Sequence, residues 1–185
     1  MQKDKGTIHK LFALILLLWG IVCWGVLWTI MKAGYTNRHI EDCLTQANLA
    51  ALRVDPYHYG ATGELVFENA DKIKDIFEEV LYEGLGNTET KKNLGIKDAE
   101  LLDFRIYEVT SKEISEIIFD RYDNCNIVRH AKGGEVRAPD GTSIESSAIY
   151  ARIAVPTEFL FGVEVTAIKE HCVDIVSEEV WNEQK

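Results

Sequence analysis

The chain has 185 residues, and its 30 acidic residues outnumber its 20 lysines and arginines, which gives a formal net charge of −10. This acidity argues against binding of nucleic acid and against docking on anionic lipid, because both partners require a basic surface. The length suits one domain of about 150 residues beside a short targeting or anchoring segment.

Residues 11–31 form a run without any charged side chain, LFALILLLWGIVCWGVLWTIM. A helix of this length, at ~1.5 Å per residue, spans roughly 30 Å, the thickness of the hydrocarbon core of a bilayer. The apolar core of a secretory signal peptide has only ~7–15 residues and ends at a small-x-small site, which Ile30-Met31-Lys32-Ala33 does not provide. We therefore expect an uncleaved membrane anchor, with a cleaved signal peptide as the alternative.

The charges that flank the apolar run predict its orientation. Residues 1–32 hold four lysines and one aspartate, so the remaining 153 residues carry a net charge of −13. Three of the lysines precede the span, and by the positive-inside rule this places the N-terminus in the cytoplasm. We thus expect a single-pass protein of the cell membrane that contacts lipid through residues 11–31. Its three parts are a cytoplasmic arm (1–10), a transmembrane helix (11–31) and an exported domain (32–185).

Beyond the span, residues 32–55 are expected to continue the helix in amphipathic form until Pro56 disfavours a helical conformation for Asp55. Apolar side chains recur there with a period of 3.6 residues and form one stripe: Ile40, Leu44, Ala47, Ala51 and Val54. We expect this stripe to pack against the exported sheet. The alternative is that it contacts a neighbouring subunit and serves assembly.

Residues 63–99 predict a strand, a helix and a connection. A short strand is expected at Gly63–Phe67, and a helix over Ala70–Leu85 that Asn69 or Asp71 caps. The polar residues 87–99 then predict a connection with one helical turn.

Residues 100–176 predict an antiparallel sheet that is followed by a tail, 177–185. A first strand is expected from Leu102 through Phe104 and Ile106, with Tyr107–Val109 as its possible extension, and weaker strands are expected at Ile114–Phe119 and Ile127–His130. Two alternating runs, Ile149–Val155 and Val163–Ile175, predict a hairpin that Pro156–Gly162 joins. Gly133-Gly134 and Pro139-Asp140-Gly141 are turn signals. The predicted fold class is therefore α+β, a long helix packed on a C-terminal antiparallel sheet with one further helix.

The sequence contains no residue spacing that is typical of a catalytic motif or a metal site. No two histidines are four residues apart and no C-x-x-C is present, while His171 and Cys172 would point to opposite faces of a strand. Glu78-Glu79 and Glu178-Glu179 are adjacent pairs that do not face one another on a helix. We therefore predict a protein that is not an enzyme, with no catalytic residues, no cofactor and no metal site.

Three cysteines belong to the predicted exported domain: Cys43, Cys125 and Cys172. An odd number permits one disulfide and one free thiol, or no disulfide. We predict that Cys125 and Cys172 pair, since both lie in the β half of the domain.

Three segments resemble a known family: IEDCLTQANLAALRVDPYHYGATGE (Ile40–Glu64), FRIYEVT (Phe104–Thr110) and VRAPDGTSIESSAIYARIAVPTEFLFGVEVTAIKEHCVDIV (Val136–Val176). The chain is similar to minor pilins or pseudopilins of the tight-adherence (Tad, TadE/TadF-like) branch of type IV filament systems in Gram-positive bacteria. The resemblance implies a pilin-like fold, a role in a filament or secretion apparatus or in cell adhesion, and other pilin-like subunits or secretion-platform proteins as partners.

One departure from that family concerns the prepilin processing site. Type IV prepilins are usually cut after a Gly, and a Glu follows at the fifth mature position. Gly6 is placed for such a cut, but the fifth residue after it is Leu11 and the span contains no Glu. The competing hypothesis is a membrane-tethered exported binding or scaffold protein of a secretion or conjugation system that does not polymerise.

Overall fold

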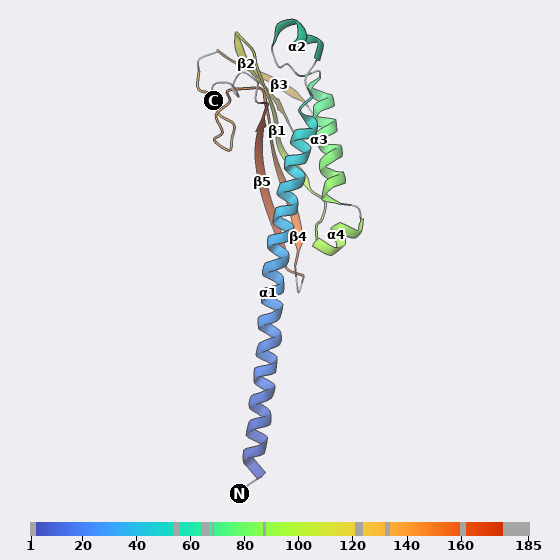
Figure 1. Ribbon diagram of the computed structural model, residues 1–185, viewed down its shortest axis with the longest axis vertical. Coiled ribbons are helices and arrows are strands. Elements are labelled where there is room, and N and C mark those ends of the chain that lie inside the picture. Colours follow the sequence, from blue (N-terminus) through green and yellow to red (C-terminus); the bar gives the residue numbers. More distant parts are fainter. Residues whose placement is uncertain are drawn as a thin grey trace.

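The computed structural model describes residues 3–53, 56–63, 67, 69–86, 88–120, 124–131, 134–159 and 162–175. These residues form an α+β fold, with helices in the first half of the chain and five strands in the second. One helix, α1 (Lys3–Ala51), runs the length of the molecule: its first half projects alone and its second half lies against the domain (Figure 1). The helix passes from the apolar run into the domain without interruption, as the sequence predicts.

The end of α1 differs from the prediction. The helix ends at Ala51 rather than at Asp55, and the next helix, α2 (Pro56–Thr62), begins at the proline itself. Proline suits the first position of a helix, because its missing N–H has no helical partner at that position. Pro56 thus starts a new helix, and the chain leaves α1 several residues earlier.

The predicted central helix is present with the predicted bounds as α3 (Ala70–Leu85). Asn69 caps it: its side-chain oxygen accepts hydrogen bonds from the N–H groups of Asp71 (2.9 Å) and Lys72 (3.4 Å). Its buried side chains lie four residues apart on one face: Ile73, Phe77, Leu81 and Leu85. This face packs on α1, where the absence of a side chain at Gly84 admits the Cys43 sulfur.

The number of helices differs from the single further helix that the sequence predicts. Within the described residues, α2 and a second short helix, α4 (Thr88–Leu94), accompany α3. The helical turn expected in the 87–99 connection is therefore present as α4. Most of the strand predicted at Gly63–Phe67 lies outside the described residues, as does the tail at 177–185.

The five strands form one antiparallel sheet in the order β3-β2-β1-β4-β5. Their bounds are β1 (Glu100–Val109), β2 (Glu113–Phe119), β3 (Cys125–Ala131), β4 (Ala148–Glu158) and β5 (Glu164–Asp174). Strands are thus present at each place where the sequence predicts one between residues 100 and 175, including the C-terminal hairpin.

The β4–β5 hairpin is longer than the sequence predicts, because β4 continues through Pro156 to Glu158. Pro156 lies opposite Thr166 of β5, and its carbonyl accepts a hydrogen bond from the Lys97 N–H (2.8 Å) on the other side of the strand. The missing N–H of Pro156 therefore faces away from β5, and the hairpin ladder loses no hydrogen bond.

The two faces of the sheet have different environments. α1 and α3 cover one face and bury an apolar core there: Phe104, Ile106, Ile117, Phe119, Ile149, Ala151, Ile153 and Val155. The aromatic rings of Phe77 and Phe119 flank that of Phe104, with centroids 4.9 and 5.8 Å away. The segment 134–147 covers one end of the other face, over Tyr107 and Tyr150.

The predicted turn Pro139-Asp140-Gly141 folds that segment back on itself. The Gly141 N–H donates to the Ala138 carbonyl (2.9 Å), and the Ala138 N–H donates to the Thr142 carbonyl (2.9 Å). Gly141 has φ 90°, a conformation that favours glycine. Local sequence therefore determines this turn.

A substitution at Gly95, in the connection between α4 and β1, is expected to lower the unfolding free energy of the domain. Gly95 has φ +73°, and a Cβ atom there would lie 2.1 Å from the Glu158 carbonyl oxygen. Gly95→Ala must break the hydrogen bond between the Glu158 N–H and the Gly95 carbonyl (2.7 Å), and we expect it to cost roughly 2–3 kcal/mol of unfolding free energy. Urea denaturation checks this, with Gly60→Ala as the control because nothing lies within 4 Å of its Cβ position. Equal midpoints for the two variants would contradict the expectation.

Candidate functional site

The first half of α1 exposes its apolar side chains on all sides. Trp19, Trp24 and Met31 are 65%, 72% and 70% exposed, and the other large side chains between residues 11 and 31 are exposed in the same way. Within the described part of the chain, α1 is the one helix long and apolar enough to cross a membrane. The helix is therefore compatible with a membrane anchor.

The second half of α1 buries the predicted stripe. Ile40, Leu44, Ala47 and Ala51 are at most 1% exposed and belong to the core that α1 forms with α3, β4 and β5. Their burial confirms the packing prediction for these four residues, and Val54 lies outside the described residues. One continuous helix thus carries both the exposed apolar segment and part of the domain core.

Polar contacts fix the position of α1 along β5. The Asn48 amide donates to the His171 carbonyl (3.1 Å), and the Lys169 ammonium pairs with the Glu41 carboxylate (2.6 Å). The hydrogen bond from Lys169 lowers the pKa of Glu41. Thr45 lies 3.4 Å from Nδ1 of His171, so this histidine belongs to a structural contact.

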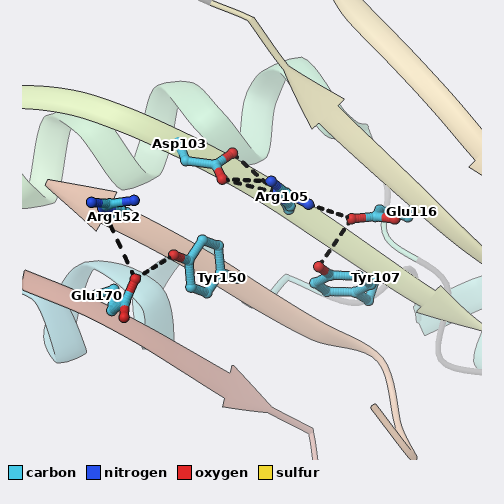
Figure 2. A network of polar contacts seen from close by, with 7 residues as sticks. All are labelled: Asp103, Arg105, Tyr107, Glu116, Tyr150, Arg152 and Glu170. Carbon is cyan, nitrogen blue, oxygen red and sulfur yellow. Dashed lines mark hydrogen bonds and ion pairs between the residues drawn. The ribbon is translucent and has the colours of Figure 1, made fainter. Parts of the chain in front are cut away.

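A network of polar side chains lies on the sheet face opposite the helices (Figure 2). Arg105 of β1 is at its centre. Its guanidinium donates to both carboxylate oxygens of Asp103 at 2.8–3.1 Å and to Glu116 Oε1 of β2 at 2.9 Å. The Tyr107 hydroxyl donates to the same Glu116 oxygen (3.1 Å), and His130 Nε2 of β3 lies 3.1 Å from the other oxygen.

A second part of the network joins β4 to β5. The Tyr150 hydroxyl donates to Glu170 Oε2 (2.7 Å), and Arg152 lies 4.0 Å from the same oxygen. Arg152 and Glu170 are cross-strand neighbours in the ladder, while Tyr150 lies opposite Arg105. The first part therefore joins β1, β2 and β3, the second part joins β4 and β5, and the two parts lie side by side in the ladder of β1 and β4.

Glu116 and Tyr107 illustrate the electrostatics of the network. Burial would raise the pKa of Glu116, but the hydrogen bonds from His130, Arg105 and Tyr107 outweigh it and lower that pKa. Burial and the Glu116 charge raise the pKa of Tyr107. Arg105 directs three of its nitrogens at carboxylates, so the arrangement is that of an ion-pair clamp that joins strands.

This network is not among the features predicted from the sequence. A signal was present, because Asp103, Arg105 and Tyr107 alternate with the apolar Phe104 and Ile106 along one strand. Their partners on β2 and β3 depend on strand order and register, which alternation alone does not give.

Lowering the pH is expected to reduce the unfolding free energy of the domain, partly because Glu116 becomes protonated. Its folded-state pKa lies below the usual 4.5, so its stabilising contribution is complete above pH ~4.5 and is lost as the pH falls through the folded-state pKa. We expect Glu116→Gln to flatten the fall in urea midpoint below pH ~4.5. Glu108 titrates with the opposite sign, because burial raises its pKa, and Glu108→Gln is therefore the control. A Glu116→Gln curve parallel to that of the wild type would contradict the expectation.

The predicted disulfide is wrong. Cys125 and Cys172 are free thiols, on β3 and β5, the opposite edges of the sheet. Four strand spacings of ~4.8 Å separate them by roughly 19 Å, whereas a disulfide requires Cα atoms within about 7 Å. Burial raises the pKa of the Cys172 thiol to about 12. Cys43 is also free, and it is buried between α1 and α3.

The remaining sequence motifs form no reactive cluster in the described part of the chain. No group of three or more histidine, cysteine, aspartate or glutamate side chains there could hold a metal ion. Glu78 pairs with Lys74 (3.0 Å) on the surface of α3. Glu178-Glu179 and Gly133 lie outside the described residues.

Comparison with known proteins identifies no relative: no family model, no curated protein and no solved structure matches the chain.

Proposed function

We propose that the chain is a non-enzymatic, membrane-anchored structural subunit of pilin-like organisation. Residues 11–31 span the cell membrane, the N-terminus is cytoplasmic and the domain is exported. The subunit serves a Tad-type or related type IV filament or secretion apparatus, and its partners are other pilin-like subunits or platform proteins.

The observation that carries this proposal is the continuity of α1. The helix has no break between the exposed segment that ends at Met31 and the buried stripe that begins at Ile40. The domain is therefore attached rigidly to its apolar segment (Figure 1). A tether has no need of such rigidity, whereas an assembling subunit needs it to hold the domain in one orientation.

The exposed apolar segment also requires a covering environment. Leaving one large aliphatic or aromatic side chain in water costs about 1.5–3 kcal/mol relative to burying it, and this segment exposes more than a dozen of them. A bilayer provides such cover, and so does a bundle of the same segments from neighbouring copies. The same surface thus serves as membrane anchor and as assembly interface.

One observation favours the second candidate, a membrane-tethered exported binding or scaffold protein that does not polymerise. The span contains no acidic residue, and Leu11 stands at the fifth position after Gly6 where prepilins of the resembled family carry Glu.

The topology is expected to be N-in and C-out. Protease added to intact spheroplasts should remove the domain and spare an N-terminal epitope tag. Protection of the domain in intact spheroplasts, with digestion only after lysis, would reverse the proposed orientation.

Assembly is tested by breaking the rigid connection. We expect the wild-type chain in the fraction that shearing removes from the cell surface. Inserting Gly-Gly-Gly-Ser between Lys32 and Ala33 should abolish recovery there and leave the protein in the membrane. The same insertion in the exposed turn at Ser111–Lys112 is the control. A wild-type chain found only in the membrane would favour the tether, and undiminished shearing of the Lys32 insertion variant would contradict the role of rigidity.

A further inference from the structure

Four lysines surround one hollow at the end of the domain from which α1 projects. The hollow has a volume of about 370 Å³, and Lys32 of α1, Lys91 and Lys92 of α4, and Lys97 of the following connection line it. Glu158 at the end of β4 and the following Phe159 also line it. Figure 1 shows α4 and the end of the β4–β5 hairpin at this end of the domain, beside α1.

The lysines of the hollow are only partly neutralised. Lys91 pairs with Asp98 (3.1 Å), and Lys97 pairs with Glu158 (3.7 Å) and with Glu164. These ion pairs hold the two side chains in place at the rim.

The other two lysines have no carboxylate partner among the described residues. Lys32 donates to the Glu158 carbonyl oxygen (3.5 Å), and Lys92 is exposed on α4. Among the described side chains of the hollow, the four lysines and the three carboxylates Asp98, Glu158 and Glu164 sum to a net charge of +1. The residues after Lys32 carry −13 in total, so this local basic site is not apparent from the net charge of the chain.

The position of Lys32 directly after the apolar run indicates which anion can reach the hollow. If residues 11–31 fill the hydrocarbon core, the headgroup layer adds about 5–8 Å on each side. At ~1.5 Å per residue this layer covers roughly the first four or five residues after Met31. The hollow therefore lies at the level of the phosphates of the outer leaflet, and this inference rests on the proposed membrane anchoring.

We propose that the lysine hollow binds the phosphodiester group of an anionic phospholipid in the outer leaflet. One such group neutralises the net charge of +1. Lysine binds phosphate as a mobile point charge, so Lys32 and Lys92 converge on one phosphate from two different elements. The lipid then bridges α1 and α4 and holds the base of the domain on the membrane surface.

The test uses the full chain in detergent, titrated with phosphatidylglycerol or phosphatidylcholine, and counts bound lipids by native mass spectrometry. We expect the wild type to bind phosphatidylglycerol more tightly than phosphatidylcholine. Lys92→Ala should weaken phosphatidylglycerol binding about fivefold, the factor that corresponds to about 1 kcal/mol per lysine at an anionic surface. Lys92→Arg should retain binding, and Lys112→Ala in the exposed β1–β2 turn is the matched control.

Three outcomes would overturn the proposal. They are equal binding of the two lipids, an equal loss in Lys112→Ala and Lys92→Ala, and displacement of the lipid by millimolar inorganic phosphate, which would indicate a site for the free anion. Carbonate extraction of cell membranes separates this result from the anchor itself. A chain that resists extraction but shows no lipid preference contradicts only the lysine hollow, whereas a chain that carbonate releases contradicts the proposed function.

Discussion

Leu44→Asp is expected to unfold the domain that follows the apolar segment of α1. Leu44 is 1% exposed, in the core that α1 shares with α3 and the sheet. The substitution removes about 2–3 kcal/mol of apolar burial and places a carboxylate without a partner in that core, at a cost of several kcal/mol more. The sum is comparable to the whole stability of an ordinary domain, about 5–15 kcal/mol.

Pulse proteolysis of the detergent-solubilised full chain measures this effect, because only the unfolded domain is cleaved. Leu49→Asp is the matched control, since Leu49 is on the same helix and 56% exposed, and we expect it to change the stability by less than about 0.5 kcal/mol. If Leu44→Asp kept its resistance while recovery in the sheared fraction fell, the stripe would serve a neighbouring subunit instead of the core. If Leu44→Asp changed neither the proteolysis resistance nor the recovery in the sheared fraction, the stripe would have no role in folding or in assembly.

Arg105→Leu is expected to destabilise the domain by about 3 kcal/mol. The substitution leaves Asp103 without its bidentate partner and Glu116 with only Tyr107 and His130. Removing one partner of a buried ion pair typically costs about 3–5 kcal/mol, and the partial exposure of these side chains places the expected cost at the lower end of that range.

Urea denaturation of the full chain in detergent checks this value. Arg129→Leu is the control, because the Arg129 side chain is 70% exposed and its contact with Glu113 is 3.7 Å long. Adding Glu116→Gln to Arg105→Leu should recover part of the loss, since it removes a charge that has lost its main counter-ion. Equal midpoints for the Arg105 and Arg129 variants would show that the network contributes no more than a surface ion pair.

Features that depend on neighbours in the chain could be predicted from the sequence. The apolar run predicts a helix of membrane-spanning length, because its length and lack of charge are local properties. The helix at Ala70–Leu85, its Asn69 cap and the turn at Pro139–Gly141 follow from backbone preferences within a few residues. The stripe on α1 follows from helical periodicity, so its burial could also be predicted.

Features that join distant segments depended on the tertiary structure. The Cys125–Cys172 disulfide was predicted wrongly, because only strand order shows that β3 and β5 are opposite edges of the sheet. The clamp around Arg105 depends on register, which aligns Tyr107 with Glu116. The lysine hollow depends on α1, α4 and the end of β4 meeting at one place. The sequence by itself determined the long apolar helix and the local elements, whereas the charged sites required the fold, because charges from separate segments act together only where packing brings them close.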